Sequence, residues 1–423
     1  MHEKKTLQKP KYLLLLLALA FVVRLIFSYR YHFPLQGDAG HYFSCARNLI
    51  ENGYFGVESV PDRIRPPVYP FFLALAGLLS GGQISEVTYT ALNTVADLIS
   101  IIILFLLAKR FSAIFPVLAI GFVAVSPMWF GHVNTAITEP LSITLFLAFL
   151  YYWTTDNRKM REMLLSGVFL GLLSLTRSMF LFFPVILVFH DLAFRLFERQ
   201  KRTNVITEVK MKGVFLFSAY VLPIFWGFRN LISTGQFSVT QPEVSRFMLW
   251  LSIKVPMLDF RVQESNRAFY SLHLVQKLIN EKDPTRQNQL RALMDHEFWT
   301  YIKEHPLDYM ATIPPKLWRL WVEGWLNPYP YGLSPQFDSV FYLILFVGPV
   351  LVLGTLGIFR IFLGKQRKQI IYFTSMQVLL VMYVTLITAP LVVDARYSLI
   401  PFVCFSLFMG GGIAFIKNRF RDV

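Results

Sequence analysis

Charged residues and cysteines are scarce in this sequence. Only 16% of its 423 residues are charged, whereas 55% are hydrophobic and 16% are aromatic. One soluble core would not bury so much apolar surface, so a membrane is the expected solvent. The two cysteines are Cys45 and Cys404, and the second lies inside an apolar run, so no disulfide framework is expected. The sequence also has no internal repeat, which counts against a transporter built from inverted repeats.

The basic residues are arranged by topology rather than on one soluble face. The formal net charge is +15, a value that can indicate nucleic-acid binding. However, the lysines and arginines form short clusters between apolar runs, as they do in the loops of membrane proteins. We therefore expect membrane lipids as partners and no nucleic acid.

Apolar runs predict an all-α polytopic membrane protein with about ten transmembrane helices. The N-terminal run follows lysines and contains Ala18-Leu19-Ala20, which imitates a signal-peptide cleavage site. Because the apolar run continues to Phe27, we expect an uncleaved first helix. The stretch 68–80 is too short to span and follows Pro66-Pro67. The predicted spans are 11–29, 84–108, 113–131, 139–155, 162–176, 178–196, 212–228, 339–361, 371–389 and 398–416.

The positive-inside rule gives the orientation. If 68–80 does not span, all the main basic clusters fall on one side, which must be the cytoplasm; these are Lys4/Lys5, Lys109/Arg110, Arg158/Lys159/Arg161, Arg195 to Arg202, Lys365/Arg367/Lys368 and Lys417/Arg419/Arg421. We therefore expect a multi-pass inner-membrane protein with a cytoplasmic N-terminus and a functional site on the periplasmic face. The outer segments are 30–67, 132–138, 177, 229–338 and 390–397.

Three parts are expected along the chain. Residues 1–228 form a transmembrane module that includes the first outer loop, 30–67. Residues 229–338 form a small extracytoplasmic segment, rich in Trp, Tyr and Phe, which is expected to lie on the membrane surface as interfacial helices do. Residues 339–423 supply the C-terminal transmembrane helices.

The first outer loop carries the most informative carboxylate, Asp38. The sequence predicts an amphipathic helix in which Asp38 is the N-cap and Gly53 ends the helix. Asp38 follows the first span directly, where it can face a cavity at the membrane surface. The alternative is that this carboxylate only caps the helix.

Two arginines in the same loop, Arg63 and Arg65, oppose the positive-inside bias. Pro66-Pro67 stiffens the backbone directly after Arg65. A planar guanidinium suits a pair of phosphate oxygens. The alternative is that each arginine extends to anionic lipid headgroups, and for Arg63 we expect this alternative.

Other ionisable residues lie at span ends on the predicted outer face. Glu139 precedes Pro140 at a helix start, where the helix dipole alone favours a carboxylate. Arg177 occupies a very short turn, so we expect a phosphate or Glu139 as its partner. Arg396 lies at the last outer turn, with Asp394 as an alternative partner.

Two further pairs have more ordinary interpretations. Arg24 and Asp97 lie inside predicted spans, and we expect them to pair structurally. His41 and Cys45 are one helical turn apart, but two ligands without others nearby do not predict a metal site built by the protein.

The order of these motifs resembles that of bacterial GT-C glycosyltransferases. It is closest to the family 39-like branch, which is related to protein mannosyltransferases and lipid A aminoarabinose transferases. The matching pieces cover most of the chain: Gly37-Asp38-Ala39-Gly40-His41-Tyr42, Ala46-Arg47-Asn48-Leu49-Ile50, Gly53-Tyr54-Phe55, Arg65-Pro66-Pro67-Val68-Tyr69-Pro70, Thr138-Glu139-Pro140, Leu175-Thr176-Arg177, the segment from Glu304-His305-Pro306 to Leu317-Trp318-Arg319, and Arg396-Tyr397.

The resemblance implies a GT-C fold with juxtamembrane helices in the first outer loop and a polyprenyl-phosphate-sugar donor. The acceptor is a lipid, a glycan or a protein. Asp38 is expected as the catalytic carboxylate and Glu139 as a second acidic site residue. The donor phosphate is expected to bind Arg65, together with Arg177 or Arg396, while acceptor or sugar contacts are expected at His41, Tyr42 and Tyr69.

Two departures from the family pattern matter. Ala39 stands where the family often has a second acid, and Arg65 stands where aminoarabinose transferases have lysine. They leave the sugar and any divalent metal open. The expected chemistry is inverting transfer with Asp38 as general base. The alternatives are a flippase for a lipid-linked glycan and a polymerase or ligase of the O-antigen type.

Overall fold

The computed structural model describes residues 10–32, 35, 37–58, 60–110, 116–155, 158–197, 205–239, 242–255, 272–281, 283–323, 348–363, 368–391, 395–409, 411–413 and 416. Within these ranges the regular secondary structure is helical, apart from one antiparallel hairpin that pairs Gly56 with Pro61. The elements are α2 (Pro10–Arg30), α3 (Gly37–Asn52), β1 (Gly56–Val57), β2 (Val60–Pro61), α4 (Val68–Leu79), α5 (Glu86–Arg110), α6 (Pro116–Val125), α7 (Pro127–Phe130), α8 (Glu139–Trp153), α9 (Met160–Ser174), η1 (Ser178–Phe180), α10 (Phe183–Phe197), α11 (Val205–Thr234), α12 (Pro242–Lys254), α14 (His273–Asn280), α15 (Pro284–Glu304), α16 (Pro306–Ala311), α17 (Ile313–Trp318), η2 (Arg319–Glu323), α20 (Gly348–Leu363), α21 (Lys368–Thr388), η4 (Ala395–Ser398) and α22 (Leu399–Ser406).

The described residues contain 5 helices that are long and apolar enough to cross a membrane: Lys11–Arg30, Glu86–Arg110, Ser178–Phe197, Val205–Thr234 and Ile370–Thr388. Each lies where the sequence predicts a span. The total of ten stays a prediction, because α8 and α9 have only 15 residues each and residues 111–115 and 339–347 lie outside the described residues. Helix α4 has 12 residues, which makes it about 18 Å long. That length agrees with the prediction that 68–80 does not span.

The chain forms two compact units. The first contains residues 1–240, 348–379 and 399–423, and the second contains 241–347 and 380–398. The C-terminal segment 339–423 therefore contributes to both units, with α21 divided between them. The three-part division expected from the sequence stays a prediction.

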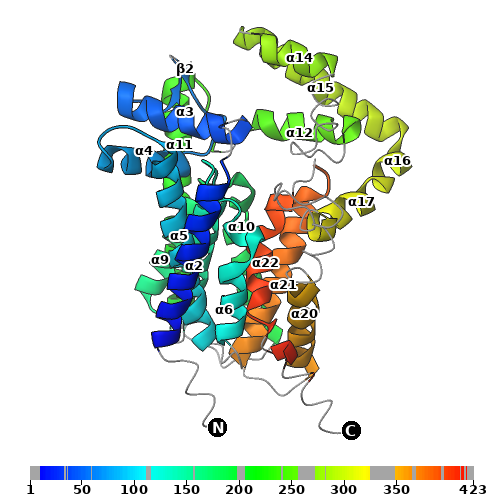
Figure 1. Cartoon of the computed structure of the whole chain (residues 1–423). Helices are drawn as coiled ribbons and strands as arrows, with labels where there is room; N and C mark the ends of the chain where they lie inside the picture. The colour runs from blue at the N-terminus through cyan, green and yellow to red at the C-terminus, as the bar shows by residue number, and fades with distance from the viewer. Residues whose placement is uncertain are drawn as a thin grey trace. The chain divides into compact units, whose positions relative to one another are not determined.

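Helix α8 is mostly buried and packs against both α5 and α9, and α9 also packs along α11; Figure 1 labels α5, α9 and α11 in this bundle. Gly167 and Gly171 make the second contact possible. A Cβ at Gly171 would lie 2.6 Å from the carbonyl oxygen of Ala219 on α11. Small residues four apart allow helix backbones to approach closely inside a membrane.

A buried ion pair connects the first helices of this unit. Arg24 of α2 pairs with Asp97 of α5 and also donates to the carbonyl oxygens of Ala20 and Ala124. Both charged side chains are almost fully buried. The predicted structural pairing of Arg24 with Asp97 is therefore confirmed.

The second unit has its own small core under α12, α14 and α15. Trp250, Leu251, Val275, Met294 and Phe298 are buried together. The indole Nε1 of Trp250 donates to Glu297 at 3.0 Å. The predicted aromatic segment from Met294 onward is helical as far as Glu323; its relation to a membrane surface stays a prediction.

Candidate active site

The predicted helix of the first outer loop exists as α3, with one change at its start. Gly37 has φ +54° and Gly53 has φ +73°, so glycines precede and follow the helical turns. Asp38 lies in the first turn rather than at the N-cap position. Its carboxylate therefore pairs with a residue that is distant in the sequence. The prediction of a helix cap considered only neighbouring residues and did not include such a partner.

That partner is Arg65. A guanidinium nitrogen of Arg65 lies 2.8 Å from Oδ1 of Asp38, and the two side chains are 20% and 39% exposed. The Arg65 guanidinium also lies 5.5 Å from the ring centroid of Tyr42. Asp62 orients the backbone here, since its carboxylate accepts the N–H groups of Ile64 at 2.8 Å and Arg65 at 3.2 Å. The pair is organised by the protein and open to solvent.

A second ion pair joins Arg177 to Glu139. The Arg177 guanidinium donates to Oε1 of Glu139 at 2.5 Å, with Glu139 almost fully buried. Glu139 lies in the first turn of α8 beside Pro140, where the helix dipole stabilises its charge. The sequence-based expectation that Glu139 is a partner of Arg177 is confirmed.

Hydrogen bonds to backbone carbonyl oxygens hold the loop before α8 and the turn after α9. The side-chain amide of Asn93 on α5 donates to the carbonyl oxygens of Val133 at 3.1 Å and Thr135 at 2.7 Å. The N–H of Val68 donates to the carbonyl oxygen of Leu175 at 3.1 Å. The start of α4, just after Arg65, is therefore fastened to the turn that carries Arg177.

Tyr42 lies close enough to both ion pairs for their charges to act on it. Burial and the charge of Asp38 raise the pKa of the Tyr42 phenol well above its usual value, and Arg65, Glu139 and Arg177 also act on it electrostatically. Its ring packs edge-on against Tyr69 with centroids 5.7 Å apart. The structure thus brings together six predicted site residues: Asp38, Tyr42, Arg65, Tyr69, Glu139 and Arg177. Tyr69 is fully buried, and its contact with a sugar stays a prediction.

Arg396 belongs to η4 in the second unit, where it is half-buried. Its predicted alternative partner, Asp394, lies outside the described residues. A role for Arg396 in donor binding stays a prediction. Arg63 donates to the side chain of Gln236, a contact within the first unit.

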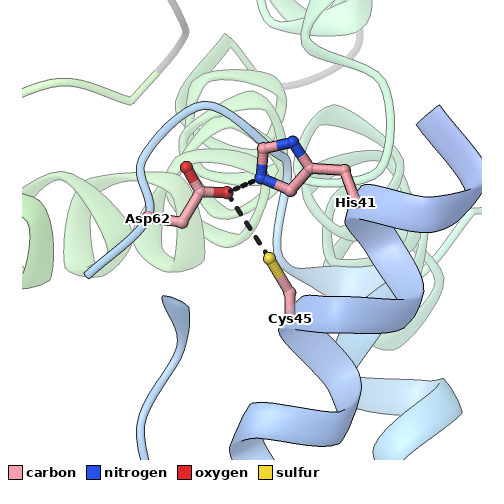
Figure 2. A group of neighbouring side chains, drawn as sticks. All are labelled: His41, Cys45 and Asp62. Atoms are coloured by element: carbon pink, nitrogen blue, oxygen red, sulfur yellow. Dashed lines mark hydrogen bonds and ion pairs between the residues drawn. The ribbon is translucent and has the colours of Figure 1, made fainter. Parts of the chain in front are cut away.

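Sequence reasoning missed two residues beside the site, Asp62 and Arg229. Asp62 receives a hydrogen bond from His41 at 2.9 Å and the Cys45 thiol at 3.5 Å (Figure 2). Arg229 donates to the carbonyl oxygens of Asp62 at 2.6 Å and of Phe55. Arg229 lies near the outer end of a predicted span, so the argument used for Arg177 could have found it. Asp62 gave no comparable signal, because its partners are about twenty residues away in the sequence.

The opposite end of the first unit has a different charge cluster. Asp191 of α10 pairs with Arg158 at 3.2 Å, with Arg195 at 3.0 Å and with Lys212. The hydroxyl of Tyr372 also donates to Asp191, at 2.8 Å. Asp191 is 1% exposed, so this one buried carboxylate joins α10, α11, α21 and the chain before α9.

Comparison with known proteins supports a family resemblance. Residues 64–226 match the family model of dolichyl-phosphate-mannose-protein mannosyltransferase. No curated protein sequence matches the chain.

Among solved structures, the apo Archaeoglobus fulgidus oligosaccharyltransferase is similar, with a TM-score of 0.53 and 11% identity over 97% of this chain and 50% of that one. The A. fulgidus oligosaccharyltransferase AglB, in complex with an inhibitory peptide and a dolichol-phosphate, has a TM-score of 0.53 and 12% identity over 98% of this chain and 51% of that one. ArnT from Cupriavidus metallidurans bound to undecaprenyl phosphate has a TM-score of 0.38 and 14% identity over 95% of this chain and 77% of that one. The chain thus spans about half the length of the oligosaccharyltransferases. The predicted resemblance to GT-C membrane glycosyltransferases is confirmed.

Proposed function

We propose that the chain is a membrane glycosyltransferase that takes a sugar from a polyprenyl-phosphate-linked donor. The observation that carries the proposal is the pair of carboxylate–guanidinium contacts, Asp38–Arg65 and Glu139–Arg177, both of which act on Tyr42. Two guanidiniums suit the oxygens of a phosphate. A solvent-accessible carboxylate beside them suits an acceptor hydroxyl.

In the proposed reaction the acceptor hydroxyl attacks the anomeric carbon as the bond from that carbon to the phosphate oxygen breaks. Asp38 takes the hydroxyl proton, and the polyprenyl phosphate leaves with the bonding electron pair. Attack opposite the leaving phosphate inverts the anomeric configuration. General-base assistance of this kind is worth about 10²–10⁴ in rate.

Arg65 and Arg177 stabilise the negative charge of the leaving phosphate. Without a donor, each arginine is paired with a carboxylate. Donor binding then replaces a carboxylate oxygen by a phosphate oxygen at each guanidinium. For Arg65 this exchange also releases Asp38 to act as the base. Glu139 is buried and stays close enough to orient Arg177.

The donor class and the side of the membrane rest on separate supports. The A. fulgidus oligosaccharyltransferase AglB, which has a similar fold, is in complex with a dolichol-phosphate, and this favours a lipid phosphate as the donor's carrier. Lys109 and Arg110 lie in the last turn of α5, and Arg195 lies in the last turn of α10, where the sequence predicts cytoplasmic ends. The positive-inside rule then favours the outer face for Asp38. The acceptor is a lipid, a glycan or a protein.

The test is mass spectrometry of membrane glycolipids and envelope glycans from a strain that lacks the gene. We expect one sugar to be missing from one acceptor and the unused lipid-linked donor to accumulate. The wild-type gene should restore the product, while a gene with Asp38→Asn should not.

A flippase would give a different pattern. Its loss would remove every product made from the translocated lipid, and Asp38→Asn would restore them unless transport itself needed the carboxylate. An unchanged set of glycans in the deletion strain would contradict the proposed transferase.

A further inference from the structure

His41, Cys45 and Asp62 form a cluster that the proposed reaction does not use. Their ligand-type atoms, Nε2, Sγ and a carboxylate oxygen, all lie within 4.8 Å of one another (Figure 2). His41 and Cys45 are one turn apart on α3, and Asp62 follows β2. The geometry points to a Zn²⁺ site formed by these three side chains, outside the Asp38–Glu139 region and independent of the proposed transfer reaction.

Two of the three separations are near those around a tetrahedral zinc ion, and the third, between His41 and Cys45, is at most 4.8 Å. Zinc bonds of about 2.3 Å to sulfur and about 2.0 Å to oxygen separate the two ligand atoms by about 3.5 Å at a tetrahedral angle. The Cys45 sulfur lies 3.5 Å from Oδ2 of Asp62. The His41 nitrogen lies 2.9 Å from the same oxygen, so zinc binding requires these two atoms to separate by about 0.4 Å.

The crowding at Oδ2 of Asp62 also favours a metal over hydrogen bonds alone. This oxygen faces His41 Nε2, the Cys45 thiol and the N–H of Arg65 at 3.2 Å. A thiol is a weak hydrogen-bond donor, whereas a thiolate is a strong zinc ligand. A side chain that is 0% exposed, as Cys45 is, gains little from such a weak contact.

The surroundings already orient the ligands as metal sites require. Oδ1 of Asp62 accepts the N–H of Ile64 at 2.8 Å, and Arg229 fixes the carbonyl of Asp62. The His41 side chain is 23% exposed, which leaves a path for the ion and for a water molecule as the fourth ligand.

Binding displaces one proton and moves another. The Cys45 thiol loses its proton to solvent, while His41 becomes the tautomer with hydrogen on Nδ1, so that Nε2 donates its lone pair to the ion. One thiolate and one carboxylate then balance the charge of Zn²⁺. The ion would fasten α3 to the 60–65 segment.

The first test is the zinc content of the full chain, purified in detergent with an affinity tag that binds no metal. After dialysis against Zn²⁺ and removal of excess ion, we expect about one zinc per chain, measured by inductively coupled plasma mass spectrometry. Cys45→Ser and Asp62→Asn should lose most of it. Cys404→Ser, which removes the other buried cysteine, and His32→Gln, which removes an exposed histidine, should keep it.

The second test uses wild-type protein, so it does not depend on a variant that folds. Replacement of zinc by Co²⁺ should give a thiolate-to-metal charge-transfer band, and EDTA should remove the band and lower the melting temperature. Wild-type protein that retains no zinc, a cobalt spectrum without a thiolate band, or equal zinc in Cys45→Ser would each overturn the site. These results do not depend on whether the chain transfers a sugar.

Discussion

The two ends of the first unit arrange their charges differently. At one end two carboxylates each have one arginine partner, in the pairs Asp38–Arg65 and Glu139–Arg177. At the other end Asp191 alone binds Arg158, Arg195 and Lys212. A single, partly exposed ion pair such as Asp38–Arg65 contributes little to stability, so it can exchange partners. A buried carboxylate with three cations is fixed, because its loss leaves several charges without compensation.

The largest expected effect is at Asp38. Asp38→Asn should lower the rate of sugar transfer by about 10²–10⁴, because an amide cannot take the acceptor proton, while the melting temperature stays close to that of wild type. The measurement is turnover by purified protein with donor lipid extracted from the deletion strain. Glu51→Gln, at an exposed carboxylate on the same helix, should leave turnover unchanged; wild-type turnover in Asp38→Asn would remove this residue from the mechanism.

Asp191→Asn should affect stability rather than turnover, in contrast to Asp38→Asn. We expect it to destabilise the fold by about 3–5 kcal/mol, because it breaks a buried ion cluster, and to lower the melting temperature in detergent. Glu208→Gln removes a more peripheral partner of Arg195 and should cost less. If Asp191→Asn melted like wild type but had lost transfer, the roles assigned to the two ends would be reversed.

Lys316, in the second unit, is a buried cation that pairs with no carboxylate among the residues that the structure describes. Its side chain is 0% exposed, and burial lowers its pKa to about 8. The unfolded chain therefore binds more protons than the folded one between about pH 8 and 10.4, so stability should rise with pH across that window.

Lys316→Met should abolish this pH dependence and stabilise the protein at pH 7 by up to about 3 kcal/mol. The check is the melting temperature from pH 7 to 10.5. Lys303→Met, at an exposed position on α15, is the matched control and should keep the wild-type profile. A Lys316→Met profile that still rises with pH would show that another group is responsible.

The smallest effects should come from the two site arginines. Arg65→Ala and Arg177→Ala should each weaken binding of a polyprenyl phosphate by about 10–100-fold, the range for one charged hydrogen-bond partner. Arg161→Ala, at an exposed position in the first turn of α9, should bind like wild type. Unchanged affinity in both site variants would exclude the proposed phosphate contacts.

Much of this comparison could be predicted from the sequence. Apolar runs gave the positions of the five long helices, and charge at span ends singled out Asp38, Arg65, Glu139 and Arg177. The pairing of Glu139 with Arg177 could be expected because both lie at short outer turns.

The remaining contacts could not be predicted, because they depend on tertiary packing. Nothing local in the sequence joins Asp62 to His41, or Asp191 to Tyr372, which is 181 residues away. Asp38 was expected as a helix cap, yet its partner is set by the path of the chain around the β1–β2 hairpin. Helix α8 ends two residues before its predicted span does, and α9 begins and ends two residues earlier than predicted, since hydropathy alone does not show where a helix ends.

The account depends most on which side of the membrane the Asp38 end faces. Glu51→Cys lies on α3 and Arg161→Cys at the start of α9, both at exposed positions, while Cys45 and Cys404 are buried and give little background. A membrane-impermeant maleimide added to intact cells should label Glu51→Cys and not Arg161→Cys. Labelling of Arg161→Cys alone would place α3 in the cytoplasm and contradict sugar transfer at the outer surface.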